Sequence, residues 1–264
     1  MPTFTHAGRT HHYLDEGEGP PLVLLHAFPL HAELFRPQLQ ALRSELRIIA
    51  PDLRGFGRSG AVASGEAITM QDYADDVLAL MEHLGLEEVA LGGVSMGGYI
   101  ALALLRTDPS RVRALVLSDT QMSADDEAGK QRREDTARAL EARGMGLLEV
   151  SMPPKLLAQP APQELVKQVR GWIRETSPLA AAAATRGMAE RPDSRDILAR
   201  YAGPLLVVVG EQDEITPPQK AQEMADLVKG SELRRIRGAG HLPNLEQPEA
   251  FNEALRSFFA PLRG

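Results

Sequence analysis

The chain has 264 residues, of which 43% are hydrophobic and 25% are charged, a composition typical of a globular protein. Its 29 basic and 36 acidic residues give a net charge of −7, and no basic stretch is interleaved with aromatic residues, so the composition argues against a nucleic-acid partner. The absence of cysteine excludes disulfides, thiolate catalysis and cysteine-ligated metal sites.

The N-terminal residues, MPTFTHAGRT, contain no apolar run of the kind that forms the centre of a secretory signal peptide. No apolar run in the chain approaches the roughly 20 residues that a membrane-spanning helix needs. We therefore expect a soluble, cytoplasmic protein without a membrane partner. The sequence leaves the oligomeric state open.

Short runs of Val, Leu and Ile alternate with helical patterns along the chain. Strands are predicted, in chain order, at His11–Asp15, Pro21–His26, Leu46–Ala50, Glu88–Val94, Val112–Ser118, Pro204–Gly210 and Glu232–Arg237. Helices are predicted between and after them at Ala32–Ser44, Gln71–His83, Met96–Thr107, Pro218–Val228 and Pro248–Phe259. Runs that are apolar throughout are typical of strands covered on both faces. We predict an α/β fold with a doubly wound, mostly parallel sheet, an early antiparallel strand and an edge-like last strand.

Between Gln121 and Tyr201 the sequence shows helical patterns and no strong strand. These patterns cover Ser123–Arg143, Gln163–Thr176 and Leu179–Glu190, and the sequences MPPK and QPAPQ are predicted to be loops between them. So long a helical insertion between two sheet strands predicts a helical cap. The predicted division is a first core part at 1–120, the cap at 121–201 and a second core part at 202–264.

Four large apolar residues of the predicted cap are candidates for a substrate pocket. They are Trp172, Met145, Met152 and Met188. Each is as well suited to packing between cap helices as to facing a substrate, so the sequence assigns none of them. An apolar pocket for a short or medium acyl group is the modest expectation.

The sequence Gly93-Val94-Ser95-Met96-Gly97 fits the pattern G-x-S-x-G, with a predicted strand before it and a predicted helix after it. In that setting the pattern indicates a sharp turn that presents the serine hydroxyl as a nucleophile. Gly93 and Gly97 lack the Cβ atoms that would collide across such a turn. A glycine-rich turn without chemistry is the alternative, because five-residue matches also occur by chance.

A serine hydroxyl needs an adjacent base to act as a nucleophile. His241 is the best placed of the seven histidines, because it lies in a glycine-containing loop after the last predicted strand. Asp213 follows the Pro204–Gly210 strand and is the predicted acceptor for the imidazole. The order Ser95, Asp213, His241 is the one expected for this type of fold. Three other acidic residues are alternatives for the acid: Glu211, Glu214 and, as second choice, Asp119.

Two backbone N–H groups are predicted to form an oxyanion hole. The first belongs to Met96, directly after the candidate nucleophile, and the second to Phe28, in the loop after the Pro21–His26 strand. His26 is expected to tie this loop by hydrogen bonds. His31 either lines the pocket or lies at the surface of the loop.

The sequence resembles the α/β-hydrolase superfamily over nearly the whole chain. The blocks that carry the resemblance are LLHAFP, PDLRGFGRS, GVSMGGYIAL, RVRALVLSDT, VVVGEQDEITPP and GAGHLPNLEQPEAF. Within the superfamily the chain is most similar to small bacterial esterases, 3-oxoadipate enol-lactonases and cofactor-free haloperoxidase-like members. The resemblance implies a catalytic triad of Ser95, Asp213 and His241 with backbone donors at Phe28 and Met96.

The sequence departs from the family pattern at two points. The family usually has His-Gly where this chain has His26-Ala27, and a positive φ at that position would strain Ala27. The nucleophile is Ser95, whereas haloalkane dehalogenases and epoxide hydrolases use an aspartate. For the loop Pro51–Ser59, which contains charged residues, the resemblance implies a structural role.

We therefore expect a serine hydrolase that cleaves carboxylic esters of small to medium substrates through an acyl-enzyme on Ser95. Enol-lactone hydrolysis, perhydrolysis of the haloperoxidase type and non-catalytic binding on the same fold are the alternatives. The expected partner is a small-molecule ester or lactone. No cofactor or metal is expected, since no histidine pair has ligand spacing and no phosphate-binding glycine loop is present.

Overall fold

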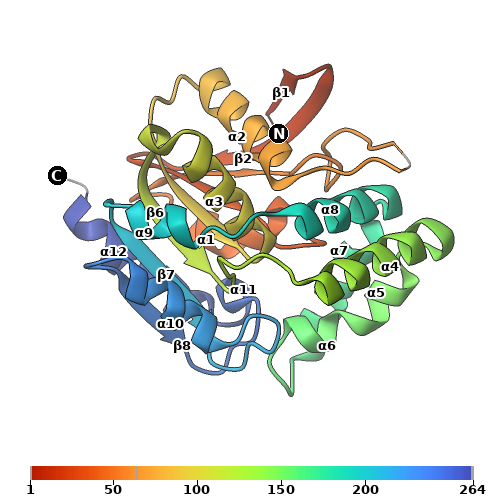
Figure 1. Cartoon of the computed structure of the whole chain (residues 1–264). Coiled ribbons are helices and arrows are strands. Elements are labelled where there is room, and N and C mark those ends of the chain that lie inside the picture. The colour runs from red at the N-terminus through yellow and green to blue at the C-terminus, as the bar shows by residue number, and fades with distance from the viewer. Residues whose placement is uncertain (1, 64, 263–264) are drawn as a thin grey trace.

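The computed structural model describes residues 2–63 and 65–262. Over these residues eight strands form one sheet in the order β1-β2-β4-β3-β5-β6-β7-β8. Their bounds are β1 Thr3–His6, β2 Arg9–Glu16, β3 Pro21–Leu25, β4 Arg47–Pro51, β5 Val89–Val94, β6 Val112–Ser118, β7 Leu205–Gly210 and β8 Glu232–Ile236. The strands from β4 to β8 in this order are parallel, and β1 and β2 pair antiparallel. The predicted fold class is confirmed (Figure 1).

Alternation along the strands creates a separate apolar core on each face of the sheet. In β3, Val23 and Leu25 belong to one core, whereas Leu22 and Leu24 belong to the other. Successive side chains of a strand point to opposite faces, so a strand that is buried on both faces is apolar at every position. This explains why the apolar runs of the sequence locate the central strands.

Strand β1 was not predicted from the sequence. It has four residues, and Phe4 is the one that is fully buried. A single buried residue produces no alternating pattern over such a short segment. The strand forms because it pairs with β2 in an antiparallel hairpin, in which Phe4 lies opposite His11.

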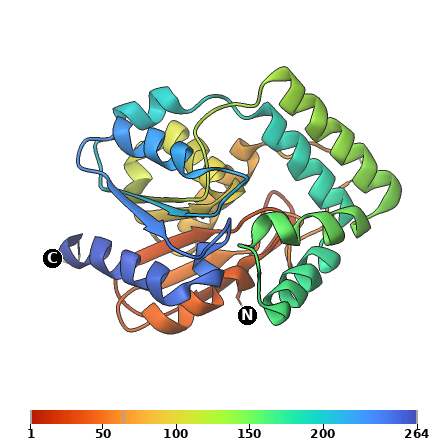
Figure 2. The same cartoon turned by 90° about the horizontal axis from the view of Figure 1, so that it is seen from below.

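Helices cover both faces of the sheet (Figure 2). On one face lie α2 (Met70–His83), α3 (Met96–Thr107), α9 (Arg195–Arg200) and α10 (Pro218–Leu227); on the other lie α1 (Arg36–Leu42), α11 (Pro243–Glu246) and α12 (Pro248–Phe259). The predicted helix Ala32–Ser44 is divided into a 3-10 turn, Ala32–Phe35, followed by α1. None of the helices in the described residues is both long enough and apolar enough to cross a membrane.

Five helices between β6 and α9 form a cap at one side of the sheet (Figure 1). They are α4 (Glu127–Arg143), α5 (Gly146–Ser151), α6 (Pro153–Leu156), α7 (Gln163–Glu175) and α8 (Pro178–Glu190). The last part of the predicted cap forms α9, which packs against α3 and α10 on the sheet. The division at 1–120, 121–201 and 202–264 stays a prediction.

The prediction of a loop at MPPK is wrong, because Pro153–Leu156 forms the short helix α6. Proline is compatible with the first turn of a helix, where its missing N–H has no partner within the helix. The two prolines therefore begin a helix here instead of interrupting one. The predicted helix at Ser123–Arg143 also begins later than expected, at Glu127. Asp126 is the N-cap residue of this helix, and its side chain accepts a hydrogen bond from Gly129 N.

Candidate active site

Three side chains from separate loops meet at the carboxyl edge of the parallel strands. Ser95 follows β5, Asp213 follows β7 and His241 follows β8. His241 Nε2 lies 2.7 Å from Ser95 Oγ, and His241 Nδ1 lies 2.8 Å from Asp213 Oδ2. Asp213 and His241 are buried, with 3% and 1% of their surface exposed. The structure thus connects the three residues into one hydrogen-bonded chain.

The turn at Ser95 has the strained backbone that the motif requires. Ser95 has φ of 55° and ψ of −114°, values that residues with a side chain rarely adopt. A Cβ atom on Gly93 would lie 2.1 Å from the backbone of Gly97, and a Cβ atom on Gly97 would lie 2.0 Å from Leu25 O. Both glycines are therefore needed for the turn to pack against itself and against β3.

Asp213 is held in place by its own loop. Its Oδ1 accepts hydrogen bonds from the N–H groups of Ile215, at 2.8 Å, and Thr216, at 3.1 Å, and the Thr216 hydroxyl donates to Oδ2 at 2.6 Å. Burial by itself raises the pKa of Asp213, but the hydrogen bonds from His241 and Thr216 outweigh it and hold the pKa below its usual range. The carboxylate is therefore ionised and oriented toward the imidazole.

The three alternative acids lie elsewhere. Glu211 and Glu214 are exposed on the same loop. Asp119 is buried beside Asp213, but its oxygens accept hydrogen bonds from Gly210 N at 2.9 Å and from the Ser118 hydroxyl at 2.6 Å. Burial, and next the charge of Asp213, raise the pKa of Asp119 well above its usual range. Asp213 is thus the carboxylate that His241 contacts.

The model of the alpha/beta hydrolase fold family matches residues 20–248 of this sequence. The chain belongs to that family. As in the family pattern, the candidate nucleophile, acid and base of this hydrolase follow core strands in the chain order Ser95 after β5, Asp213 after β7 and His241 after β8.

Three known proteins show how the hydrolase compares with its relatives. A thermophilic esterase from Thermogutta terrifontis, solved with malate bound, is 38% identical, with a TM-score of 0.94 over 99% of this chain and 97% of the esterase. 3-Oxoadipate enol-lactonase 1 of Acinetobacter baylyi is 28% identical over 90% of this chain and 88% of its own length. A bromoperoxidase from Bacillus anthracis, 23% identical over 96% of each chain, shares the fold with a TM-score of 0.84.

The two predicted oxyanion donors of the hydrolase belong to residues near Ser95. Met96 N–H is at the first position of α3, and Phe28 lines the same cavity as Ser95. In the part of the chain that the structure describes, neither N–H donates a hydrogen bond to the protein. Both are therefore available to a bound oxygen atom. Ala27 does not have a positive φ, so the alanine that replaces the family glycine is unstrained.

His26 holds the loop that carries Phe28. Its Nδ1 lies 3.0 Å from Ala27 O, and Leu53 N donates to its Nε2 at 3.1 Å. Because Nε2 accepts, Nδ1 carries the proton and the ring is neutral. Burial lowers the pKa of His26 to about 4. This agrees with the expected structural role.

The cavity next to Ser95 has a volume of about 510 Å³. Ser95, His241 and Phe28 line it from the core, and Met152 and Met188 line it from the cap. The other two apolar candidates lie elsewhere. Met145 is buried in the core, and the ring of Trp172 packs edge-on against His31 at 5.4 Å, around a separate hollow.

Glu246 is a positioning residue that the sequence did not identify. Its Oε1 accepts hydrogen bonds from Gly240 N at 2.9 Å and Leu242 N at 3.2 Å, one on each side of His241. Its Oε2 accepts from Ala158 N, in the cap, at 2.6 Å. Burial raises the pKa of Glu246. The side chain thus joins the histidine loop to the cap, a contact that no spacing in the sequence indicates.

One group of described residues has the spacing of a metal site. Its potential ligand atoms lie within 4.8 Å of one another and belong to Asp119, Asp213 and His241. Every oxygen of Asp213 already accepts hydrogen bonds from the protein. The same atoms orient His241 toward Ser95. The oxygens of Asp213 are therefore already occupied by hydrogen-bond donors of the protein.

Proposed function

We propose that this hydrolase cleaves carboxylic esters of small to medium substrates through an acyl-enzyme on Ser95. The observation that carries the proposal is the hydrogen-bonded chain from Ser95 Oγ through His241 to an ionised, anchored Asp213. A histidine between a hydroxyl and a carboxylate can take the hydroxyl proton while the carboxylate stabilises the imidazolium that forms.

In the first stage, Ser95 Oγ attacks the ester carbonyl carbon and His241 Nε2 accepts the proton. The carbonyl oxygen gains negative charge and is stabilised by the Phe28 and Met96 N–H groups, each worth on the order of 10²–10³ in kcat. When the tetrahedral intermediate collapses, the alcohol leaves with the proton from His241. In the second stage, His241 takes a proton from water, which attacks the acyl-enzyme. When this second tetrahedral intermediate collapses, His241 returns the proton to Ser95 Oγ, and the acid is released.

The relatives support an ester bond as the target. The Thermogutta terrifontis structure is named as an esterase and covers nearly the same length. The likeness to 3-oxoadipate enol-lactonase 1 makes an enol-lactone the second candidate substrate, since a lactone is an internal ester and needs the same steps. A panel of simple esters and enol-lactones, assayed side by side, separates the two. Bromination in the presence of acetate and peroxide tests the perhydrolase alternative.

The decisive experiment compares Ser95→Ala with a matched serine in the same cavity. Ser151 also lines the cavity, but its hydroxyl donates to Leu147 O on its own helix. Ser95→Ala is expected to lower kcat/KM for p-nitrophenyl acetate about 10³-fold or more, with an unchanged circular dichroism spectrum. Ser151→Ala is expected to change kcat/KM little. Retained activity in Ser95→Ala, or no labelling of Ser95 by a fluorophosphonate, would reject the proposal and favour a binding protein on this fold.

A further inference from the structure

Charged side chains of one sign dominate the cavity beside Ser95. Among the described residues that line it, three carry a positive charge at neutral pH: Arg132, Arg133 and Lys155. The one carboxylate in the lining outside the Ser95–Asp213–His241 chain is Asp125. The charge of this lining is opposite to the net charge of the whole protein, which is −7.

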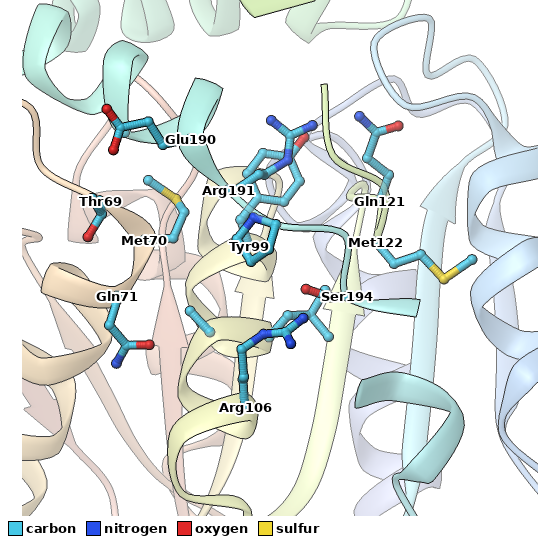
Figure 3. A pocket seen from close by; sticks show the side chains of 14 residues that line it. Thr69, Met70, Gln71, Tyr99, Arg106, Gln121, Met122, Glu190, Arg191 and Ser194 are labelled. Carbon is cyan, nitrogen blue, oxygen red and sulfur yellow. The ribbon is translucent and has the colours of Figure 1, made fainter. Parts of the chain in front are cut away.

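The carboxylate of Asp125 already forms an ion pair with a buried arginine. Arg191 donates to both of its oxygens, at 2.7 Å and 2.9 Å, and its side chain is 4% exposed. Its guanidinium also lies over the Tyr99 ring, 4.3 Å from the centroid, and both side chains line a second hollow (Figure 3). Burial opposes ionisation of Asp125, but hydrogen bonds from Arg191 and Arg133 outweigh it and lower its pKa.

Arg133 shares that single carboxylate and so contributes a surplus positive charge. Its Nε donates to Asp125 Oδ2, and its Nη1 lies 3.5 Å from the Met188 sulfur. Within the described residues its remaining N–H groups have no partner, and the side chain is 24% exposed. Glu134, next on the same helix, already accepts hydrogen bonds from two other arginines and does not balance this charge.

The two other cations of the cavity are exposed and weakly paired. The side chain of Lys155, on α6, has no ion pair or hydrogen bond in the described residues. Arg132, on α4, is 73% exposed, and its Nη2 lies 3.9 Å from Asp126. Such exposed charges attract an oppositely charged ligand over a Debye length, whereas a partly buried guanidinium with free N–H groups binds a carboxylate directly.

We propose that the natural substrate is an ester or lactone that carries a free carboxylate, which binds to Arg133 while the ester carbonyl lies at Ser95. Arg132 and Lys155 increase the rate of capture by attraction. This inference rests on the proposed ester hydrolysis and names its substrate class. One unit of negative charge matches the single surplus charge at Arg133, and the apolar remainder of the lining, including Leu148, Met152 and Met188, matches the carbon chain between the two groups.

The test uses two methyl esters with the same carbon chain. Monomethyl glutarate ends in a carboxylate, and methyl pentanoate ends in a methyl group. With the full-length wild-type protein, kcat/KM for monomethyl glutarate is expected to be about tenfold higher or more, because a charged hydrogen bond supplies that much binding energy. The preference should decrease as salt is added. Equal values for the two esters, or a preference for methyl pentanoate, would overturn the proposal.

Variants of the cavity residues test whether the preference for the carboxylate-bearing ester depends on Arg133. Arg133→Gln is expected to lower kcat/KM for monomethyl glutarate about tenfold and to change the value for methyl pentanoate less than threefold, whereas Arg133→Lys retains an intermediate preference. Arg138→Gln is the matched control, since Arg138 lies on the same helix, is 69% exposed and pairs with Glu134 outside the cavity. An equal loss on both esters in Arg133→Gln contradicts the proposal. If that variant does not fold, the double variant Arg132→Gln, Lys155→Met should still reduce the preference and its salt dependence.

The two proposals fail in different ways. If methyl pentanoate is hydrolysed through Ser95 without any carboxylate preference, the substrate class is wrong and the ester hydrolysis stands. If neither ester is hydrolysed and Ser95 is not labelled by a fluorophosphonate, the proposed function is wrong. In that case calorimetric titration with monomethyl glutarate still tests the site: binding that Arg133→Gln weakens about tenfold supports it, and no binding overturns it.

Discussion

The carboxyl group of Asp119 lies against that of Asp213, and one oxygen of each comes within 4.8 Å of the other and of a ring nitrogen of His241. Two buried carboxyl groups so close together do not both ionise, because like charges repel strongly where water is excluded. The hydrogen bonds from His241 and Thr216 hold the pKa of Asp213 down, whereas burial and the charge of Asp213 hold the pKa of Asp119 up. Asp213 is therefore the first of the two to ionise, and a proton retained by the pair resides on Asp119.

This relationship predicts different kinetics for two matched variants. Asp213→Asn removes the acceptor that orients His241 and stabilises its charged form, and it is expected to lower kcat/KM for p-nitrophenyl acetate about 10³- to 10⁴-fold. Asp119→Asn leaves the contact between His241 and Asp213 in place, and it should lower kcat/KM less than about tenfold. Steady-state kinetics of both variants decide the assignment. A larger loss in Asp119→Asn than in Asp213→Asn would make Asp119 the catalytic acid.

The raised pKa of Asp119 predicts a pH-dependent change in stability. Above pH ~4, the usual pKa of an aspartate, the folded protein holds a proton that the unfolded chain releases. The stability that wild type gains from Asp119 is therefore complete at low pH and declines as the pH rises toward the pKa of the folded state. Asparagine does not titrate, and it tolerates the φ of 46° at this position.

The free energy of unfolding of Asp119→Asn relative to wild type should thus increase between pH 5 and pH 9. Urea unfolding at pH 5, 7 and 9 measures this difference. A difference that stays constant over this range would mean that Asp119 is already ionised in the folded protein.

The contact between Gly97 and β3 predicts a large loss of stability in Gly97→Ala. The added Cβ atom would lie 2.0 Å from Leu25 O, so the backbone of the turn or of the strand must move, at a cost of about 3 kcal/mol or more. Gly171 is the control, because it lies inside α7 and a Cβ atom there meets no atom within 4 Å. Gly171→Ala should raise the free energy of unfolding by roughly 0.5–1 kcal/mol. Equal effects in the two variants would show that the turn adapts without strain.

The sequence by itself predicts the central strands, the helices that cover the sheet and the order of the candidate site residues. These features depend on patterns within short segments of the chain. A strand buried on both faces is apolar at each position, as in β3 and β7. The turn at Ser95 needs glycines at fixed distances in the chain, which the motif states directly. The alternation of these strands with helices then places the ends of β5, β7 and β8 at one edge of the sheet.

The tertiary structure alone decided features that depend on contacts between distant segments. The sequence already ranked Asp213 ahead of Asp119, and the contacts of the two carboxylates are visible only in the structure: Asp213 meets His241, and Asp119 meets the N–H of Gly210. The surplus charge at Arg133 arises because Arg191, far along the chain, takes up the same Asp125 carboxylate. Local propensity and spacing contain no information about such sharing, since the strength of a charge in a cavity is set by its neighbours in space and by their burial.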